Sequence, residues 1–183
     1  MNPTLDQLAK KFNTDKGNWS HSYTRWYSQI LDSKRYDIQS VLELGVGNGA
    51  SLKMWELYFP LAIIYGLDIN DYQSTSERII TFKFPQEDEE KLKEFTGKSL
   101  DLIIDDACHI PKSIMISLNV LFDFLSKEGY YVIEDVSGKF IKEILDFVFQ
   151  KKEEIKSIQI FASGNETIID SENNETIIFI QKS

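Results

Sequence analysis

The arrangement of apolar segments along this chain restricts its fold more than any other feature. From residue 40 onward, short runs rich in Val, Ile, Leu and Tyr alternate with stretches whose apolar residues recur at helical spacing. Such short runs are typical of buried strands. Strands that alternate with helices predict a parallel sheet joined by helical crossovers, which is a doubly wound α/β fold.

The predicted elements can be placed along the sequence. Strands are expected over residues 40–44, 62–67, 78–84, 100–104 and 130–133, and helices over 50–59, 87–95, 111–125 and 140–149. Two further strands, over 157–161 and 176–180, flank a polar stretch that contains Gly164-Asn165 and Asn173-Asn174. This pattern predicts a hairpin, which would insert an antiparallel strand at the far edge of the sheet.

The first part of the chain predicts helices. Thr4 and Gln7 have the spacing of a capping box, and residues 20–33 carry aromatic and aliphatic residues at helical spacing. A length of 183 residues suits one domain. We therefore expect a single domain over 1–183, with a helical preface or lid over 1–38 and the α/β core over 39–183.

Charge and cysteine content limit the partners. The formal net charge is −9, which disfavours a nucleic-acid substrate because phosphate backbones are negative. Cys108 is the one cysteine, so no disulfide forms within the chain. No signal-peptide pattern and no apolar run of membrane-helix length is present. We expect a cytoplasmic protein with a small-molecule partner and no membrane or nucleic-acid contact; a homo-oligomer stays open.

A glycine-rich turn follows the first predicted strand. The segment Glu43-Leu-Gly-Val-Gly-Asn-Gly49 ends that strand and begins a helix, and Asp68 ends the next strand. Glycines let the backbone approach a ligand closely. An acid at the end of the second strand commonly accepts hydrogen bonds from ribose hydroxyls. A nucleoside ligand is thus predicted. The G-x-G-x-G spacing and the acid Glu43 favour S-adenosylmethionine over a nicotinamide cofactor.

The chain resembles a bacterial group of class I S-adenosylmethionine-dependent methyltransferases related to the sugar O-methyltransferases of macrolide biosynthesis. The resemblance runs from about residue 13 to residue 136. The stretches that carry it are Thr14-Asp-Lys-Gly17 with His21, Tyr23 and Tyr27; Val41-Leu-Glu-Leu-Gly-Val-Gly-Asn-Gly-Ala-Ser51 with Trp55 and Phe59-Pro60; Tyr65-Gly-Leu-Asp68; Ile103-Ile-Asp-Asp-Ala-Cys-His109; and Tyr131-Val-Ile-Glu-Asp135. It implies a Rossmann-like methyltransferase sheet, mostly parallel with a C-terminal antiparallel hairpin.

The resemblance also implies a cofactor site for S-adenosylmethionine. The loop at Gly45 would hold the methionine part and Asp68 the ribose, while Asp105 would face the cofactor. The expected contacts come from Glu43, Gly45, Gly47, Asn48, Gly49, Asp68, Gln86 and Asp105. Two departures stand out. Pro85 replaces an acid that the family usually has near the adenine, so Gln86 or Asp88 would compensate, and Ala107-Cys108 replace a usual Gly-Ser pair.

Five polar residues, Asp105, Asp106, His109, Glu134 and Asp135, follow the fourth and fifth predicted strands. Neighbouring strand ends bring such side chains together, and converging carboxylates need a cation. Hard oxygen ligands suit Mg²⁺. The alternative is structural: the first pair of acids would cap the helix from Pro111, and the last pair would lie on a solvated loop.

The resemblance assigns roles within this group. By analogy with the sugar enzymes, Asp106, Glu134 and Asp135 would bind Mg²⁺, and His109 would be the general base. A metal bound to vicinal hydroxyls acidifies one of them, and a histidine can then accept the proton. The predicted activity is O-methylation of a hydroxyl on a sugar or polyol, with His109 and Asp106 as catalytic residues.

Three other functions stay open. A metal-independent methyltransferase would keep the cofactor and act on a different small molecule. A non-catalytic domain would bind S-adenosylmethionine or a nucleotide without turnover, which the departures at Pro85 and Ala107-Cys108 would fit. A nucleotide-binding oxidoreductase would use the same glycine turn for NAD⁺.

Overall fold

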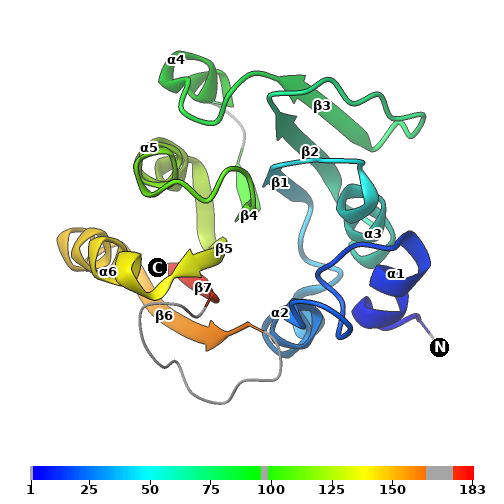
Figure 1. Cartoon of the computed structure of the whole chain (residues 1–183), viewed down its shortest axis with the longest axis horizontal. Coiled ribbons are helices and arrows are strands. Elements are labelled where there is room, and N and C mark those ends of the chain that lie inside the picture. The colour runs from blue at the N-terminus through cyan, green and yellow to red at the C-terminus, as the bar shows by residue number, and fades with distance from the viewer. Residues whose placement is uncertain (1, 96–98, 164–174) are drawn as a thin grey trace.

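The computed structural model describes residues 2–95, 99–163 and 175–183 of the chain. Within them, seven strands form one sheet in the order β3-β2-β1-β4-β5-β7-β6 (Figure 1). The strands are β1 (Ser40–Leu44), β2 (Ile63–Asp68), β3 (Ile79–Lys83), β4 (Leu100–Asp105), β5 (Leu125–Ser137), β6 (Ile155–Ala162) and β7 (Glu175–Lys182). Strands β1 to β5 are parallel neighbours, and β7 runs antiparallel between β5 and β6.

Helices cover both faces of this sheet. They are α1 (Leu5–Phe12), α2 (Tyr23–Leu31), α3 (Ala50–Tyr58), α4 (Glu89–Leu92), α5 (Pro111–Leu121) and α6 (Ile141–Gln150). Figure 1 shows α1, α2 and α3 to the right of the sheet and α4, α5 and α6 to its left. Alternate strand residues point to opposite faces, so Val41 packs in the core with Trp55 of α3, whereas Leu42 packs in the core with Leu118 of α5.

The predicted α/β fold is therefore confirmed, including the antiparallel pairing of the last two strands. Most element boundaries shift by one or two residues, and three elements differ more from the prediction. The helix expected over 87–95 is the short helix α4 followed by a 3₁₀ turn, and α5 ends at Leu121. Strand β5 begins five residues early, at Leu125, which pairs with Leu100, and it continues to Ser137 because β7 pairs with that end too. The expected turn residues Gly164-Asn165 and Asn173-Asn174 lie outside the described residues.

The helical preface forms as predicted. The Thr4 hydroxyl accepts from the Gln7 backbone N–H, and the Gln7 side chain accepts from the Thr4 backbone N–H, which completes the capping box. Helix α2 buries Tyr27, whose ring meets the Trp55 ring edge-on at 4.9 Å between centroids. This packing fixes the segment between α1 and α2 close to the carboxyl ends of the strands.

The strand order places a crevice above β1 and β4. In the sheet, β2 lies on one side of β1 and β4 lies on the other. The chain therefore turns to one side of the sheet after β1 and to the opposite side after β4, and the two loops diverge. Ligands of doubly wound sheets bind at this switch point. Here the loop at Gly45 faces Asp106, whose backbone N–H donates to the Leu44 carbonyl at 2.9 Å. In the part of the chain that is described, no helix has the length and apolar character to cross a bilayer.

Candidate active site

The glycine turn after β1 has the backbone shape that its sequence predicts. Gly45 and Gly47 have φ angles of 90° and 52°, in the left-handed region that favours glycine. A Cβ at Gly45 would lie 2.0 Å from the Asp106 carbonyl oxygen, whereas a Cβ at Gly47 would meet nothing within 4 Å. Gly45 thus allows two loops to pack together, and Gly47 leaves its backbone open to the crevice.

Asp68, at the end of β2, stabilises this turn directly. Its Oδ2 accepts hydrogen bonds from the backbone N–H groups of Val46 at 2.8 Å and Gly47 at 3.0 Å, and Oδ1 accepts from Asn70 N–H at 2.7 Å. Burial alone would raise the pKa of Asp68, but these backbone donors outweigh it and lower the pKa below its usual value. The acid therefore stays ionised beside the glycine turn.

Two cavities meet beside Asp68. The larger has a volume of about 450 Å³, and the smaller has a volume of about 320 Å³. Both are lined by Gly45, Asp68 and Ala107, so they adjoin. The larger one is bounded by the turn after β1, by residues 13–16 and by the ends of β4 and β5. The smaller one has a more apolar lining that includes Leu67 and Pro85.

The predicted cofactor residues divide into two groups. Gly45, Gly47, Asn48 and Asp68 line the larger cavity, and Gln86 lines the smaller one. Glu43, Gly49 and Asp105 are not among the lining residues of these two cavities. The structure places Glu43 and Asp105 below the loops, where both are fully buried. Their assignment to the cofactor stays a prediction, and their visible contacts are with protein groups.

Gln86 and Asp105 form a buried hydrogen-bonded pair under the smaller cavity. The Gln86 amide donates from Nε2 to both carboxylate oxygens of Asp105, at 3.1 and 3.2 Å, and Oε1 accepts from the Cys108 backbone N–H at 3.1 Å. Burial raises the pKa of Asp105 to about 6, against the opposing effect of the donated hydrogen bonds. Gln86 thus shapes the loop that carries Ala107 and Cys108.

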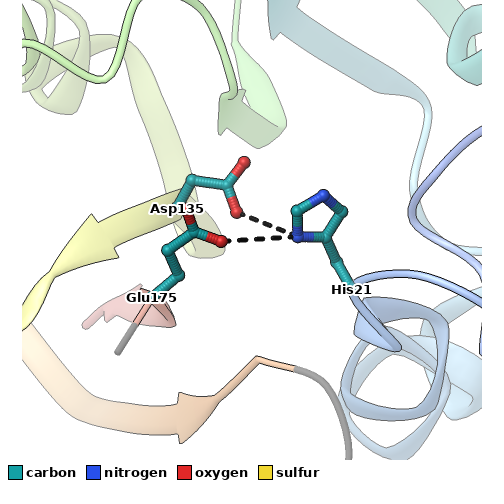
Figure 2. Close-up of side chains that lie close together, drawn as sticks. All are labelled: His21, Asp135 and Glu175. Atoms are coloured by element: carbon teal, nitrogen blue, oxygen red, sulfur yellow. Dashed lines mark ion pairs between the residues drawn. The ribbon is translucent and has the colours of Figure 1, made fainter. Parts of the chain in front are cut away.

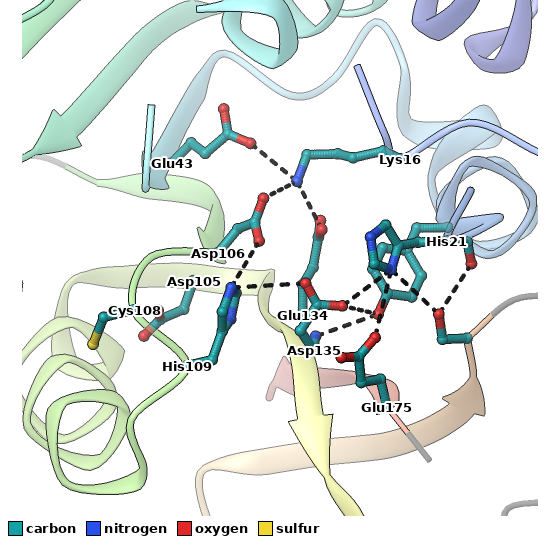
Figure 3. Close-up of polar contacts among 12 residues, drawn as sticks. Lys16, His21, Glu43, Asp105, Asp106, Cys108, His109, Glu134, Asp135 and Glu175 are labelled. Atoms are coloured by element: carbon teal, nitrogen blue, oxygen red, sulfur yellow. Dashed lines mark hydrogen bonds and ion pairs between the residues drawn. The ribbon is translucent and has the colours of Figure 1, made fainter. Parts of the chain in front are cut away.

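Acids from β1, from the loop after β4 and from β5 surround a buried lysine that the sequence analysis did not single out. Lys16 lies between α1 and α2 and is 1% exposed. Its Nζ is 3.4 Å from Glu43 Oε1 and 2.7 Å from Glu134 Oε2, and it also pairs with Asp106 Oδ2 (Figure 3). Burial alone would lower the pKa of the Lys16 ammonium, but the three carboxylates outweigh it and raise the pKa.

His109 completes the cluster on the cavity side. Its Nε2 lies 3.9 Å from Asp106 Oδ1 and 3.7 Å from Asp135 Oδ2 (Figure 3). His109 and Asp135 both have positive φ angles, of 55° and 52°, although neither is glycine. Backbone strain of this kind persists where the surroundings hold a side chain in one direction. Asp106, His109 and Asp135 all line the larger cavity.

Asp135 has a second set of neighbours on its other side. Figure 2 shows Asp135 and Glu175 both directed at the His21 ring of the preface. His21 Nδ1 lies 3.4 Å from Asp135 Oδ1 and 3.7 Å from Glu175 Oε2. The Tyr23 hydroxyl donates to the same Asp135 oxygen. This group anchors the end of β5 to the preface.

Comparison with known proteins identifies the relatives of this chain. No protein-family model matches it. L-olivosyl-oleandolide 3-O-methyltransferase of Streptomyces antibioticus is 34% identical over 143 residues, 73% of this chain and 37% of that protein. Mycinamicin VI 2''-O-methyltransferase of Micromonospora griseorubida is 36% identical over 144 residues, 73% of this chain and 36% of that protein. The chain thus spans little more than a third of the length of these curated relatives.

A solved structure agrees with these sequence matches. MycE methyltransferase of the mycinamycin biosynthetic pathway, in complex with Mg and SAH, has a TM-score of 0.82 and 28% identity over all of this chain, which covers 55% of MycE. The chain is a relative of the macrolide-sugar O-methyltransferases. Human methyltransferase-like protein 13 matches this chain with a TM-score of 0.64 at 16% identity, so these two proteins share the fold alone.

Of the three predicted metal ligands of this chain, the structure brings Asp106 and Asp135 together beside His109 but turns Glu134 away. Asp106, His109 and Asp135 each offer one ligand atom, and these atoms lie within 4.8 Å of one another. That spacing and the two carboxylates suit a divalent cation. Glu134 is turned inward, where Tyr27 donates to Oε1 and Lys16 to Oε2. Glu134 as a metal ligand therefore stays a prediction.

Lys16 is the residue whose role the sequence reasoning missed. It stood inside the matching stretch Thr14-Asp-Lys-Gly17, but no role was attached to it. One signal was present: Glu43 lies within an apolar strand, and a charge buried in a sheet needs a partner of opposite sign. The sequence does not say which of its 20 Lys and Arg residues supplies that charge.

Proposed function

We propose that this chain is the catalytic part of an S-adenosylmethionine-dependent O-methyltransferase that acts on a sugar hydroxyl of a small molecule. One observation carries the proposal: His109, Asp106 and Asp135 line the same cavity as Gly47 and Asp68. A candidate proton acceptor and a candidate cofactor cradle thus face one space. The named relatives methylate olivosyl-oleandolide and mycinamicin VI, and MycE has been crystallised with Mg, SAH and mycinamycin VI.

The two adjoining cavities suit the two halves of the cofactor. The polar, larger cavity fits a charged amino-acid group near the open backbone at Gly47. The smaller cavity, lined by Leu67, Pro85 and Ile110, fits a flat purine. Because Pro85 stands where the family usually has an acid, adenine would be held mainly by apolar packing. Asp68, between the cavities, would accept from ribose hydroxyls.

The chain's own residues supply positioning and proton transfer. S-adenosylmethionine would provide an activated methyl group, and Mg²⁺ held by Asp106 and Asp135, with Glu134 as a predicted third ligand, would lower the pKa of an acceptor hydroxyl. His109 lines the larger cavity, and its imidazole can take the hydroxyl proton as the methyl group is transferred. Asp106 and Asp135 then stabilise the resulting imidazolium, because each places a carboxylate oxygen within 4 Å of Nε2.

A second candidate keeps the cofactor but needs no metal. Lys16 favours it, because a buried ammonium already balances part of the negative charge of Asp106 and Glu134. In that case His109 would act on the acceptor without help from a divalent ion. The two candidates differ in one property, the effect of a chelator on turnover.

Binding and transfer assays test the proposal. Calorimetry should show binding of S-adenosylmethionine and S-adenosylhomocysteine, and no binding of NAD⁺. Label from methyl-labelled S-adenosylmethionine should then appear on a glycosylated macrolide and not on its aglycone. Binding of the cofactor without transfer to any glycoside in a broad panel would favour the non-catalytic domain. Binding of NAD⁺ alone would remove the methyltransferase proposal.

A further inference from the structure

Lys16 joins carboxylates from three separate strands. Glu43 lies in β1, Asp106 follows β4 and Glu134 lies in β5, and all three have an oxygen within 4 Å of the Lys16 ammonium (Figure 3). Lys16 is 1% exposed, so water gives this charge little solvation. A buried ammonium in such a place persists because its partners surround it.

Besides Lys16, the carboxylates around it contact different groups of the protein. Glu43 also accepts from Ser51 Oγ at 2.7 Å and Trp55 Nε1 at 3.2 Å. Asp106 differs, because its second oxygen, Oδ1, turns toward His109 Nε2 at 3.9 Å. Asp106 therefore belongs both to the lysine cluster and to the group of ligand atoms that suits a divalent cation.

Lys16 also fixes the loop that forms one wall of the larger cavity. Its backbone carbonyl accepts from Thr24 N–H at 3.0 Å, and the neighbouring Asp15 carbonyl accepts from His21 N–H at 3.1 Å. The backbone thus ties this loop to the start of α2, and the Lys16 side chain attaches it to the carboxylates of the sheet. Because three carboxylates lie within 4 Å of its ammonium, Lys16 serves as a fixed positive charge at this point of the site.

We propose that Lys16 is a positioning residue, a built-in counter-ion that holds Asp106 and Glu134 in place and shares their negative charge with the divalent cation of the active site. The inference rests on the proposed function, because it assumes that a divalent ion binds at Asp106. Two cations that share one carboxylate repel each other. Lys16 therefore preassembles the site at the cost of weaker binding of the ion.

Metal titration of Lys16→Met tests this inference. The variant should melt at a lower temperature than the wild type without Mg²⁺, because the buried Glu43 and Glu134 and the partly exposed Asp106 lose their cation. Addition of MgCl₂ should raise its melting temperature by more than it raises that of the wild type. Calorimetry should give a Mg²⁺ dissociation constant lower by about tenfold, since the competing charge is gone. Lys142→Met, at an exposed lysine of α6, is the matched control and should behave as wild type.

A charge-matched variant covers the case in which Lys16→Met does not fold. Lys16→Met with Glu43→Gln removes one positive and one negative charge, and Gln at position 43 can still accept from Ser51. It should again show a larger Mg²⁺-induced rise in melting temperature than the wild type. A rise equal to or smaller than that of the wild type in the variants that fold would overturn the proposal.

The Mg²⁺ titration of the Lys16 variants can fail or succeed independently of the test of methyl transfer. If neither wild type nor variants respond to Mg²⁺ while S-adenosylmethionine still binds, the shared-charge role of Lys16 is refuted and the metal-independent methyltransferase stands. If Mg²⁺ binds more tightly to the variants but no methyl group is ever transferred, the role of Lys16 holds and the proposed activity fails.

Discussion

Asp135 directs its two carboxylate oxygens at two different histidines. Oδ1 lies 3.4 Å from His21 Nδ1, and Oδ2 lies 3.7 Å from His109 Nε2. The left-handed backbone of Asp135, with a φ of 52°, sets the side chain between the two imidazoles. His109 lines the larger cavity, whereas His21 is not among its lining residues. The two histidines thus share one acid but differ in their access to a substrate.

This difference predicts unequal effects of two alanine substitutions. His109→Ala should lower kcat by about a hundredfold or more, because it removes the proposed proton acceptor. His21→Ala, the matched control, should lower kcat by less than about tenfold. Both variants should bind S-adenosylmethionine as the wild type does. Methyl-transfer kinetics with calorimetry would check this, and equal losses in the two variants would contradict the role given to His109.

Removal of divalent ions should stop turnover. Asp106 and Asp135 would hold the ion that acidifies the acceptor hydroxyl, so treatment with EDTA should abolish methyl transfer and added Mg²⁺ should restore it. Cofactor binding should survive the chelator, because Gly47 and Asp68 hold no metal in this proposal. Full activity in EDTA would instead support the metal-independent candidate.

Two glycines of the same turn should respond differently to alanine. Gly45→Ala should lower the free energy of unfolding by about 3 kcal/mol or more, since its Cβ would meet the Asp106 carbonyl oxygen and its φ is positive. Gly47→Ala meets no protein atom, so the cost should be roughly 1 kcal/mol from the left-handed backbone alone. Its methyl group should nevertheless weaken cofactor binding. Urea unfolding and calorimetry separate the two effects.

Asp68 should make the stability of the protein sensitive to acid. Backbone donors outweigh the burial of this side chain and lower its pKa in the folded state below the usual value. Its contribution is therefore complete above the unfolded-state pKa and is lost as the pH falls through the folded-state pKa. Below about pH 4, the free energy of unfolding should fall more steeply in wild type than in Asp68→Asn. Parallel curves would show that the carboxylate charge does not stabilise the turn.

Much of the fold was accessible from local patterns in the sequence. The strand over 40–44 was predicted at the same bounds as β1, because a short run with Val41, Leu42 and Leu44 is followed at once by a glycine turn. The capping box at Thr4, Asp68 at the end of β2 and Asp106 directly after β4 were likewise predictable, whereas Asp135, expected after the fifth strand, lies within β5. These features depend on residues within a few positions of one another, where periodicity and turn chemistry act.

The tertiary structure alone decided which charges meet. Lys16 pairs with Glu134 across 118 positions, and Glu43 and Asp105 turn toward buried partners and not toward the cavity. A position at a strand end predicts the edge of the sheet where a side chain lies, but not the direction in which it points. That direction depends on desolvation and on the nearest opposite charge, and both are set only when distant segments pack.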